Sequence, residues 1–460
     1  HVAASSKPVG HADLGGEWQL DVGEPYTPLF ALPEWPAVLA LTVTPTPPTY
    51  PGRTSGEFEN GYAFAALRAD GSVVTWGYAP DGGDSNTVAA RLDGTIDVTQ
   101  VFSAPQAFAA LRADGSLVTW GSASYGGDSS AVASQLDGTI DVTQVFSSIY
   151  ACAALRVDGS VVTWGVGPSG GNSSAVASQL DGTIDVTQVV STNAAFAALR
   201  ADGSVVTWGI PDYGGSPSSS TAAKLDGTID VTQVCSTQGA FAALRADGSV
   251  VAWGNSPFGG DGSMSSAVAA KLDGTTDVVQ VFSNPKAFAA LRIDGSVVTW
   301  GEWPYGGSSG AVASQLDGTI DVIQVFSTAG AFAALRADGS VVTWGDQTVG
   351  GYSGAVASKL DGTIDVTQVF SNPNAFAALR ADGSVVTWGH TSYGGNSSGV
   401  AAKLDGTTDV TQVFSSARAF AALRADGSVV TWGDPTSGGN SSAVASQLDG
   451  TIDVIQVFST

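Results

Sequence analysis

The stretch that decides the fold is residues 63–77, AFAALRADGSVVTWG, which recurs in nine closely similar copies along the 460-residue chain. Two runs of apolar and β-branched residues, 63–69 and 72–77, flank Asp70-Gly71, a dipeptide typical of tight hairpin turns. The stretch therefore predicts a β-hairpin. The spacing of its tryptophan is 44 residues, except for 45 and 47 around Trp253. The nine tryptophans are Trp76, Trp120, Trp164, Trp208, Trp253, Trp300, Trp344, Trp388 and Trp432.

A variable Gly-rich segment and a second motif complete each unit. In the first unit this motif is residues 92–103, LDGTIDVTQVFS, which predicts a turn at Asp93-Gly94 and a strand at 97–102. Residues 88–92 are a weaker, Ala-rich strand candidate. A period in the forties suits propeller blades or two-helix solenoid units, but no run of ten residues has helical periodicity. We expect an all-β chain, a β-propeller of nine four-stranded repeats.

The repeat also resembles that of the regulator of chromosome condensation family of β-propellers. The resemblance lies in Ala-Leu-Arg-x-Asp-Gly-Ser-Val-Val-Thr-Trp-Gly, followed by a Gly-rich stretch and an apolar strand, and it covers residues 61–460. Family members include exchange factors for a small GTPase, chromatin binders, a photoreceptor and secreted inhibitors of β-lactamase. The resemblance implies a β-propeller fold and a role in binding other molecules. Two features depart from the family: nine units instead of the usual seven, and segments such as 125–129 in place of Gly-Gln-Leu-Gly.

The two ends of the repeat region predict how the ring closes. The first unit lacks the strand that precedes the hairpin in every later unit, and the last unit ends with that strand at residues 453–458. We predict that this strand, through Val454, Val457 and Phe458, completes the first blade and closes a nine-bladed ring. An open spiral and a seven-bladed ring with two extra units are the alternatives.

Residues 1–60 form a separate N-terminal extension, which holds 9 of the 19 prolines and none of the repeat. Residues 35–44 read as an apolar strand between Pro-rich flanks. We expect this strand to lie on its own propeller or to dock onto a neighbouring subunit, which would link copies into a fibre. A flexible stalk followed by an ordinary intramolecular strand is the alternative. The candidate linking residues are Trp35, Val38, Leu39, Leu41 and Val43.

The net charge of the chain limits the classes of partner that it can bind, and its first residue suggests where the protein is located. A formal charge of −24, from 42 acidic and 18 basic residues, argues against nucleic acid or an anionic membrane as the main partner. No apolar stretch reaches the ~20 residues that a membrane-spanning helix needs. His1 and a single Met suggest a processed, exported chain. We expect an extracellular or cell-surface protein.

The Arg, Asp, His and Cys residues of this sequence fit structural roles better than catalytic or metal-binding roles. One Arg per unit lies two residues before the hairpin Asp, which favours a repeated ion pair or carbonyl clamp over an anion-binding ring. The Asp-rich turns lack calcium-loop spacing, and three His give neither a zinc site nor a catalytic triad. Cys152 and Cys235 replace Phe at core positions, which predicts buried thiols. We expect no enzymatic activity, no cofactor and no metal.

The loops after each Trp-Gly vary, and we predict that they share one face of the ring. Their aromatic and His residues are candidate anchors for a protein or glycan, although neutral drift also produces variation. These residues are Tyr125, Tyr213, Phe258, Trp303, Tyr305, Tyr352, His390 and Tyr393. The same loops contain three Asn-Ser-Ser sequons as possible glycosylation sites, at Asn172, Asn396 and Asn440.

Two functions fit these observations. The first is a non-enzymatic extracellular structural or adhesive propeller, a subunit of a fibre or surface assembly that self-associates through residues 1–60. The second is a soluble propeller that binds one protein or glycan through its variable loops.

Overall fold

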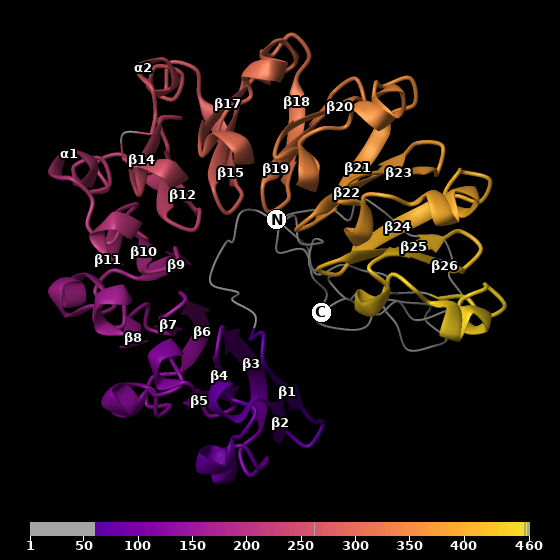
Figure 1. The fold of residues 1–460 in the computed structure, drawn as a ribbon. Helices are drawn as coiled ribbons and strands as arrows, with labels where there is room; N and C mark the ends of the chain where they lie inside the picture. The colour runs from indigo at the N-terminus through magenta and orange to yellow at the C-terminus, as the bar shows by residue number, and fades with distance from the viewer. Residues whose placement is uncertain (1–59, 262, 455–456, 458–460) are drawn as a thin grey trace, which may run out of the picture. The chain divides into compact units, whose positions relative to one another are not determined.

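The computed structural model describes residues 60–261, 263–454 and 457. Every described residue belongs to the second of the two units into which the chain divides, Thr49–Thr460. In this second unit, small antiparallel sheets follow one another side by side around an arc (Figure 1). The first strand of each three-stranded sheet lies towards the centre of the arc and the third towards its outside.

Nine sheets are formed, as the sequence predicts, and each is called a blade, numbered in chain order. Blade 1 has two strands, β1 (Ala63–Leu67) and β2 (Val73–Gly77). Blades 2 to 9 have three strands each. In order, these are β3 (Val98–Ala104), β4 (Ala107–Arg112), β5 (Leu117–Gly121); β6 (Val142–Ser147), β7 (Ala151–Arg156), β8 (Val161–Gly165); β9 (Val186–Ser191), β10 (Ala195–Arg200), β11 (Val205–Gly209); β12 (Val231–Ser236), β13 (Ala240–Arg245), β14 (Val250–Gly254); β15 (Val278–Ser283), β16 (Ala287–Arg292), β17 (Val297–Gly301); β18 (Val322–Ser327), β19 (Ala331–Arg336), β20 (Val341–Gly345); β21 (Val366–Asn372), β22 (Ala375–Arg380), β23 (Val385–Gly389); β24 (Val410–Ser415), β25 (Ala419–Arg424) and β26 (Val429–Gly433).

The predicted hairpin is confirmed in every blade. In blade 1, Ala63 pairs with Gly77 and Leu67 with Val73. The turn needs a residue with positive φ, and Gly71 supplies it at +72°. The strand after each Asp-Gly-Thr turn pairs with the hairpin of the next repeat, as β3 does with β4. Each of blades 2 to 9 therefore takes its first strand from the preceding repeat.

The strand predicted at residues 88–92 is not formed. This Ala-rich segment is a 3-10 helix, Asn86–Arg91, in which the Val88 N–H donates to the Ser85 carbonyl. Only the end of the segment reaches the hairpin, where the Val73 N–H donates to the Leu92 carbonyl at 2.9 Å. The equivalent helices are Ser130–Gln135, Ser174–Gln179, α1 (Ser219–Ala222), α2 (Ser266–Ala269), Gly310–Gln315, Gly354–Lys359, Ser398–Lys403 and Ser442–Gln447.

The hydrophobic core lies between blades. Side chains alternate along each strand, so Phe288 and Trp300 of blade 6 pack against blade 5, whereas Ala287 and Val297 pack against blade 7. We call the side towards the preceding blade the leading face and the opposite side the trailing face. Eight such clusters join the nine blades in one series within the described residues. A fully buried large side chain contributes about 1.5–3 kcal/mol, so these clusters account for much of the stability.

A hydrogen bond sets the register between neighbouring blades. The indole Nε1 of Trp208 donates to the Gly170 carbonyl of the preceding blade at 3.0 Å. The same bond, at 2.8–3.2 Å, is made by Trp120, Trp164, Trp253, Trp300, Trp344, Trp388 and Trp432. Because indole is large and its N–H needs a partner when buried, this one residue fixes both packing and register.

Blade 1 differs from the other blades on its leading face. Phe64 is 62% exposed, Val74 46% and Trp76 49%. On the trailing face of blade 9, a Cβ on Gly438 would have no atom within 4 Å. Among the predicted closing residues, Val454 donates its N–H to the Gly427 carbonyl at 3.0 Å, Val457 is half-buried and Phe458 lies outside the described residues. Closure by this strand stays a prediction.

Candidate binding face

The loop after each Trp-Gly is held at both ends. Its first residue donates to the carbonyl of the residue before the hairpin, as Ser122 N–H does to Gln106 at 2.9 Å. A short 3-10 helix follows and ends at a glycine with positive φ, such as Gly214 at +92°. A Cβ on Gly214 would lie 2.6 Å from the Phe241 ring of the next blade. The short helices are Ala79–Asp81, Ala123–Tyr125, Gly167–Ser169, Pro211–Tyr213, Ser256–Phe258, Trp303–Tyr305, Gln347–Val349, Thr391–Tyr393 and Pro435–Ser437.

Five of the eight predicted face residues occupy one equivalent position, the last of this short helix, and all five are half-buried. They are Tyr125, Tyr213, Phe258, Tyr305 and Tyr393. Polar side chains hold the backbone there: Asn284 Nδ2 donates to the Tyr305 carbonyl at 2.7 Å, and Thr237 Oγ1 donates to the Phe258 carbonyl at 2.9 Å. The backbone that carries these rings is therefore held by its own blade.

The other three predicted residues lie elsewhere in the loops. His390 precedes its short helix and stacks on Tyr393 with ring centroids 4.3 Å apart. Trp303 begins its helix and is 75% exposed, and Tyr352 lies beyond its helix and is 65% exposed. Trp303 and Tyr352 are therefore the two candidates most available to an external partner.

The half-buried rings contact the next blade. Tyr125 of blade 2 packs on Tyr150, which precedes β7 of blade 3, with ring centroids 5.5 Å apart. The Arg418 guanidinium lies 5.2 Å from the Tyr393 ring, again across a blade boundary. A Cβ on Gly330 would lie 2.8 Å from Tyr305, so the small residue leaves room for the ring. These variable residues therefore make specific side-chain contacts between one blade and the next.

Lys286 is the centre of the largest of these contacts. Its Nζ lies 4.1 Å from the Tyr305 ring centroid and 5.8 Å from that of Phe258 in the preceding blade. Glu302 completes the group with a carboxylate oxygen 3.1 Å from Nζ. The cation thus interacts with two aromatic faces and one carboxylate. Arg418 repeats the arrangement with Tyr393 and with Asp434, whose carboxylate lies 3.8 Å away.

Tyr150, Lys286 and Arg418 are not among the predicted site residues, and all three occupy the position directly before the Ala-rich hairpin strand. The signal was available, because this position varies from unit to unit as the loops do. Its nine residues are Tyr62, Gln106, Tyr150, Ala194, Gly239, Lys286, Gly330, Asn374 and Arg418.

Tyr352 lines a groove of about 680 Å³ between blades 7 and 8. Lys359, Arg380, Asn396 and Asp405 also line it. An exposed aromatic ring therefore lies beside charged and amide groups in this groove.

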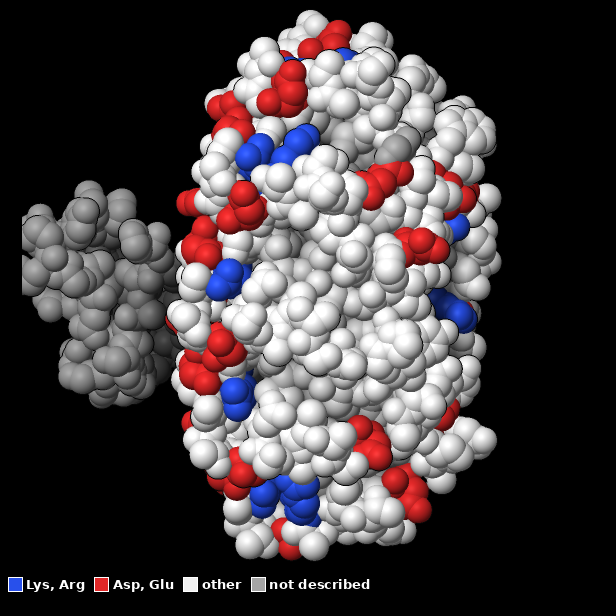
Figure 2. All heavy atoms as spheres, turned by 90° about the vertical axis from the view of Figure 1, so that its left-hand side faces the viewer, with Lys and Arg blue, Asp and Glu red and all other residues white. Residues whose placement is uncertain are grey.

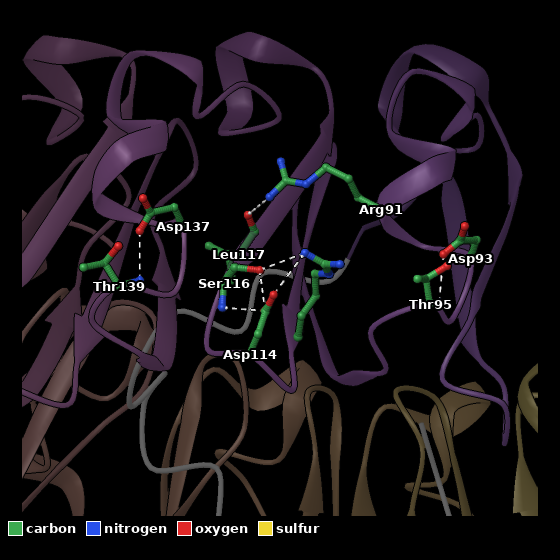
Figure 3. Close-up of polar contacts among 9 residues, drawn as sticks. Arg91, Asp93, Thr95, Asp114, Ser116, Leu117, Asp137 and Thr139 are labelled. Carbon is green, nitrogen blue, oxygen red and sulfur yellow. Dashed lines mark hydrogen bonds and ion pairs between the residues drawn. The ribbon is translucent and has the colours of Figure 1, made fainter.

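The repeated arginine forms the predicted structural ion pair. In blade 2 the Arg112 guanidinium lies 3.4 Å from Asp114 and donates to Ser116 Oγ at 3.1 Å, while Ser116 Oγ donates to Asp114 at 2.6 Å (Figure 3). The nine pairs have N–O distances of 2.8–3.6 Å. Arg91 is a carbonyl clamp, since it donates to Leu117 of the next blade at 3.1 Å. These cations serve the fold.

The Asp carboxylates of the Asp-Gly-Thr turns accept hydrogen bonds from within the same turn. The Thr139 N–H donates to the Asp137 carboxylate at 2.9 Å (Figure 3), and the Thr139 hydroxyl and amide lower the pKa of that carboxyl. Among the described residues there is no group of three His, Cys, Asp or Glu that could hold a metal ion.

Charge on the outer surface follows the same pairing. Figure 2 shows one side of the described unit, with Lys and Arg beside Asp and Glu along one edge and a largely uncharged middle. No helix in the described part is both long and apolar enough to cross a membrane.

Both cysteines are buried free thiols, as predicted. Burial raises the pKa of Cys152 and of Cys235 to about 12. The three sequon asparagines are exposed, and each accepts a hydrogen bond from the backbone N–H two residues later, as Asn172 does from Ser174 at 2.9 Å. Glycosylation of Asn172, Asn396 and Asn440 stays a prediction.

Residues 1–59 lie outside the described part of the chain. The predicted linking strand with Trp35, Val38, Leu39, Leu41 and Val43 therefore stays a prediction.

No protein-family model and no curated protein matches the chain. Similar solved structures include the WD40 ectodomain of the Arabidopsis thaliana receptor kinase ACR4, with 16% identity over 62% of this chain and 90% of that one (TM-score 0.32). They also include the structure of Kap60 bound to yeast RCC1 (Prp20), with 15% identity over 61% and 79% (TM-score 0.35). A third is the computationally designed Ika8 protein, with 16% identity over 73% and 96% (TM-score 0.29). By its own repeat and the sheets that this repeat forms, the described part of the chain has an RCC1-like β-propeller repeat fold.

Proposed function

We propose that this protein is a non-enzymatic extracellular structural propeller, a subunit of a fibre or surface assembly that associates with its own copies. One observation carries the proposal: both the constant and the variable residues are used for contacts between blades. Trp208 and Gly170 represent the constant contact, and Lys286 with Phe258 the variable one. A chain that uses both sets of residues in this way is suited to a scaffold.

The side chains that an enzyme could use for catalysis make structural contacts in this protein. The Arg112 guanidinium, the Ser116 hydroxyl and the Asp114 carboxylate bond to one another in a hairpin turn. The Cys152 and Cys235 thiols are buried, and their raised pKa keeps them in the unreactive protonated form. These features support a structural role.

The proposed link between subunits is the N-terminal extension with its apolar strand. Deleting residues 1–59 tests this role. Asn60 should be kept, because its Nδ2 donates to the Asp81 carbonyl at 2.6 Å and its Oδ1 accepts from the backbone of Tyr62 and Ala63. We expect the truncated protein to keep its thermal midpoint and to lose fibres or larger particles in negative-stain micrographs. Fibres of unchanged geometry would contradict a linking role for the extension.

The extracellular location is part of the proposal. Antibody labelling of intact cells and of the culture medium tests it. We expect the protein in the medium or on the surface, and its retention inside intact cells would contradict this location.

A second candidate function is binding of a protein or glycan by the loop face. The exposure of Trp303 and Tyr352 favours it. A glycan array and a pull-down from the native surroundings should compare the wild type with Trp303→Ala and Tyr352→Ala. Tyr125→Ala is the matched control, because its ring packs on Tyr150. Loss of binding in the first two variants at an unchanged thermal midpoint would favour this candidate, and no binding by the wild type would contradict it.

A further inference from the structure

We propose that the cavity between blades 2 and 3 binds a small aromatic molecule with a polar substituent. The ring would take the place that a Phe side chain of the chain itself fills at every other boundary between described blades. The cavity has a volume of about 260 Å³ and is lined by Cys152, the residue that replaces this Phe in blade 3. The site contains none of the predicted face residues, and it does not depend on the proposed structural function.

The boundary between blades 3 and 4 shows what this space accommodates. Here the equivalent side chain is Phe196, which is fully buried in one cluster with Ala151 and Ala153 of β7. Its ring lies so close to Gly170 that a Cβ on this glycine would be 2.5 Å from it. A phenyl ring therefore fits between two such blades. The equivalent rings at the remaining boundaries are those of Phe108, Phe241, Phe288, Phe332, Phe376 and Phe420.

The cavity between blades 2 and 3 is lined by the counterparts of the residues around that ring. Ala107, Ala109 and Gly126 of blade 2 correspond to its three neighbours, and all of them line the cavity. A Cβ on Gly126 would meet the Cys152 Sγ in place of a ring. Since the Cys side chain ends at this atom, the rest of the ring's space is left open.

Two apolar side chains of the inner strands are uncovered beside the missing ring. Phe102 of β3 and Val145 of β6 line the cavity and are only half-buried. Their counterparts at the next boundary, Phe146 and Val189, are buried. A ring bound beside Cys152 would therefore remove from water the apolar surface that the chain leaves uncovered.

Blades 2 and 3 keep the same register as other neighbouring blades. The Trp164 indole Nε1 donates to the Gly126 carbonyl at 2.8 Å, the bond that Trp208 makes to Gly170 at the next boundary. This bond holds the two blades at their usual spacing, so they do not close over the space. Because apolar cavities of about 150 Å³ already admit benzene, the volume here is sufficient for one ring.

The cavity also has polar residues on one side. Gln100 of β3 and Gln144 of β6 line it and are exposed. Both strands are the first of their blades and lie towards the centre of the arc (Figure 1). An amide group can both donate and accept a hydrogen bond, so a polar substituent on the ring would be bound on this side.

Benzyl alcohol, one aromatic ring with a hydroxymethyl group, is the probe for a titration of the full chain. Methyl NMR spectra follow Val145 in the cavity and Val325, its buried counterpart in blade 7. We expect saturable shift changes at Val145 and none at Val325. Cys152→Phe restores the residue of the other blades and should abolish these changes. Cys152→Met fills the same space with a flexible side chain and serves the same purpose if the Phe variant does not fold.

Two further variants separate the space from the thiol. Cys152→Ala removes the thiol and keeps the space, so it should still bind the probe. Phe196→Cys should create a second site at the next boundary, with saturable shift changes at Val189.

Four results would overturn the proposal. The first is a wild type without saturable changes at Val145, and the second is equal changes at Val145 and Val325, which would show general partitioning into the blades. The third is binding that persists in a folded Cys152→Phe or Cys152→Met protein. The fourth is loss of binding in Cys152→Ala, or a folded Phe196→Cys protein without changes at Val189, because the missing ring would then not create the site.

Discussion

The indole N–H of Trp208 donates to the carbonyl of Gly170, 38 residues earlier in the preceding blade, at 3.0 Å. Trp76 occupies the same place in an identical stretch of sequence, yet it is 49% exposed. The molecule therefore contains its own controls, since the same residue in the same local sequence can be compared with and without a neighbouring blade.

Replacing Trp208 with Ala should lower the free energy of unfolding by about 3–5 kcal/mol, because a large side chain is lost from a packed interface. Trp76→Ala should cost less than half as much, since this ring is already half in water. Chemical denaturation of the two variants checks the difference. Equal losses would mean that the packing between blades is not what Trp208 stabilises.

Gly214→Ala should destabilise the protein more than Gly438→Ala. Both glycines have positive φ, +92° and +97°, so both substitutions carry a backbone cost of about 1–2 kcal/mol. Only at Gly214 would the new Cβ also meet the Phe241 ring, at 2.6 Å. Thermal midpoints of the two variants separate the clash from the backbone cost. A larger drop for Gly438→Ala would contradict the packing described here.

The hairpin carboxylates should make the fold sensitive to acid. The Ser204 hydroxyl, at 2.6 Å, lowers the pKa of Asp202, opposed by partial burial and supported by the Ser204 backbone N–H. Because the folded pKa lies below the unfolded one, its stabilisation is complete above the unfolded pKa of about 3.9. It is lost as the pH falls through the lower folded pKa.

A carboxyl NMR titration of Asp202 measures this shift directly. Ser204→Ala removes the main donor and should raise the pKa of Asp202 towards its usual value. Asp426, paired with Ser428 in blade 9, is the untouched control in the same sample. An unchanged pKa for Asp202 in the variant would show that the Ser204 hydroxyl is not the cause.

The two thiols should react only when the chain unfolds. Burial raises the pKa of Cys152 and Cys235 to about 12, so almost no thiolate exists at neutral pH. We expect Ellman's reagent to modify both thiols quickly in urea and very slowly in the native protein. Val157→Cys, on an exposed turn, is the control and should react at once in the native state. Fast native modification of the wild type would show that these blades open readily.

Local sequence was sufficient for the hairpins and for the ion pairs within them. Asp70-Gly71 supplies the turn, and Arg68 lies close enough along the chain to pair with Asp70 without help from another blade. The prediction of a strand at residues 88–92 is wrong, because the conformation of this segment depends on competition between a local turn and pairing at a sheet edge. In this Ala-rich segment the local bond from Val88 to Ser85 is formed instead.

The sequence by itself determined that each repeat forms a hairpin with apolar side chains on both of its faces. Turn residues and the alternation of side chains along a strand act only over a few neighbouring residues, so local sequence is enough to specify them. Only the tertiary structure decided which rings become contacts between blades. Tyr125 and Tyr150 belong to different repeats, yet their rings are in contact because the packing of one blade on the next brings the loop of blade 2 over blade 3. Phe64 and Phe420 share an identical stretch of sequence, but Phe64 is 62% exposed and Phe420 only 1%. Burial at these positions depends on whether another blade lies against the leading face, and local sequence carries no information about that neighbour.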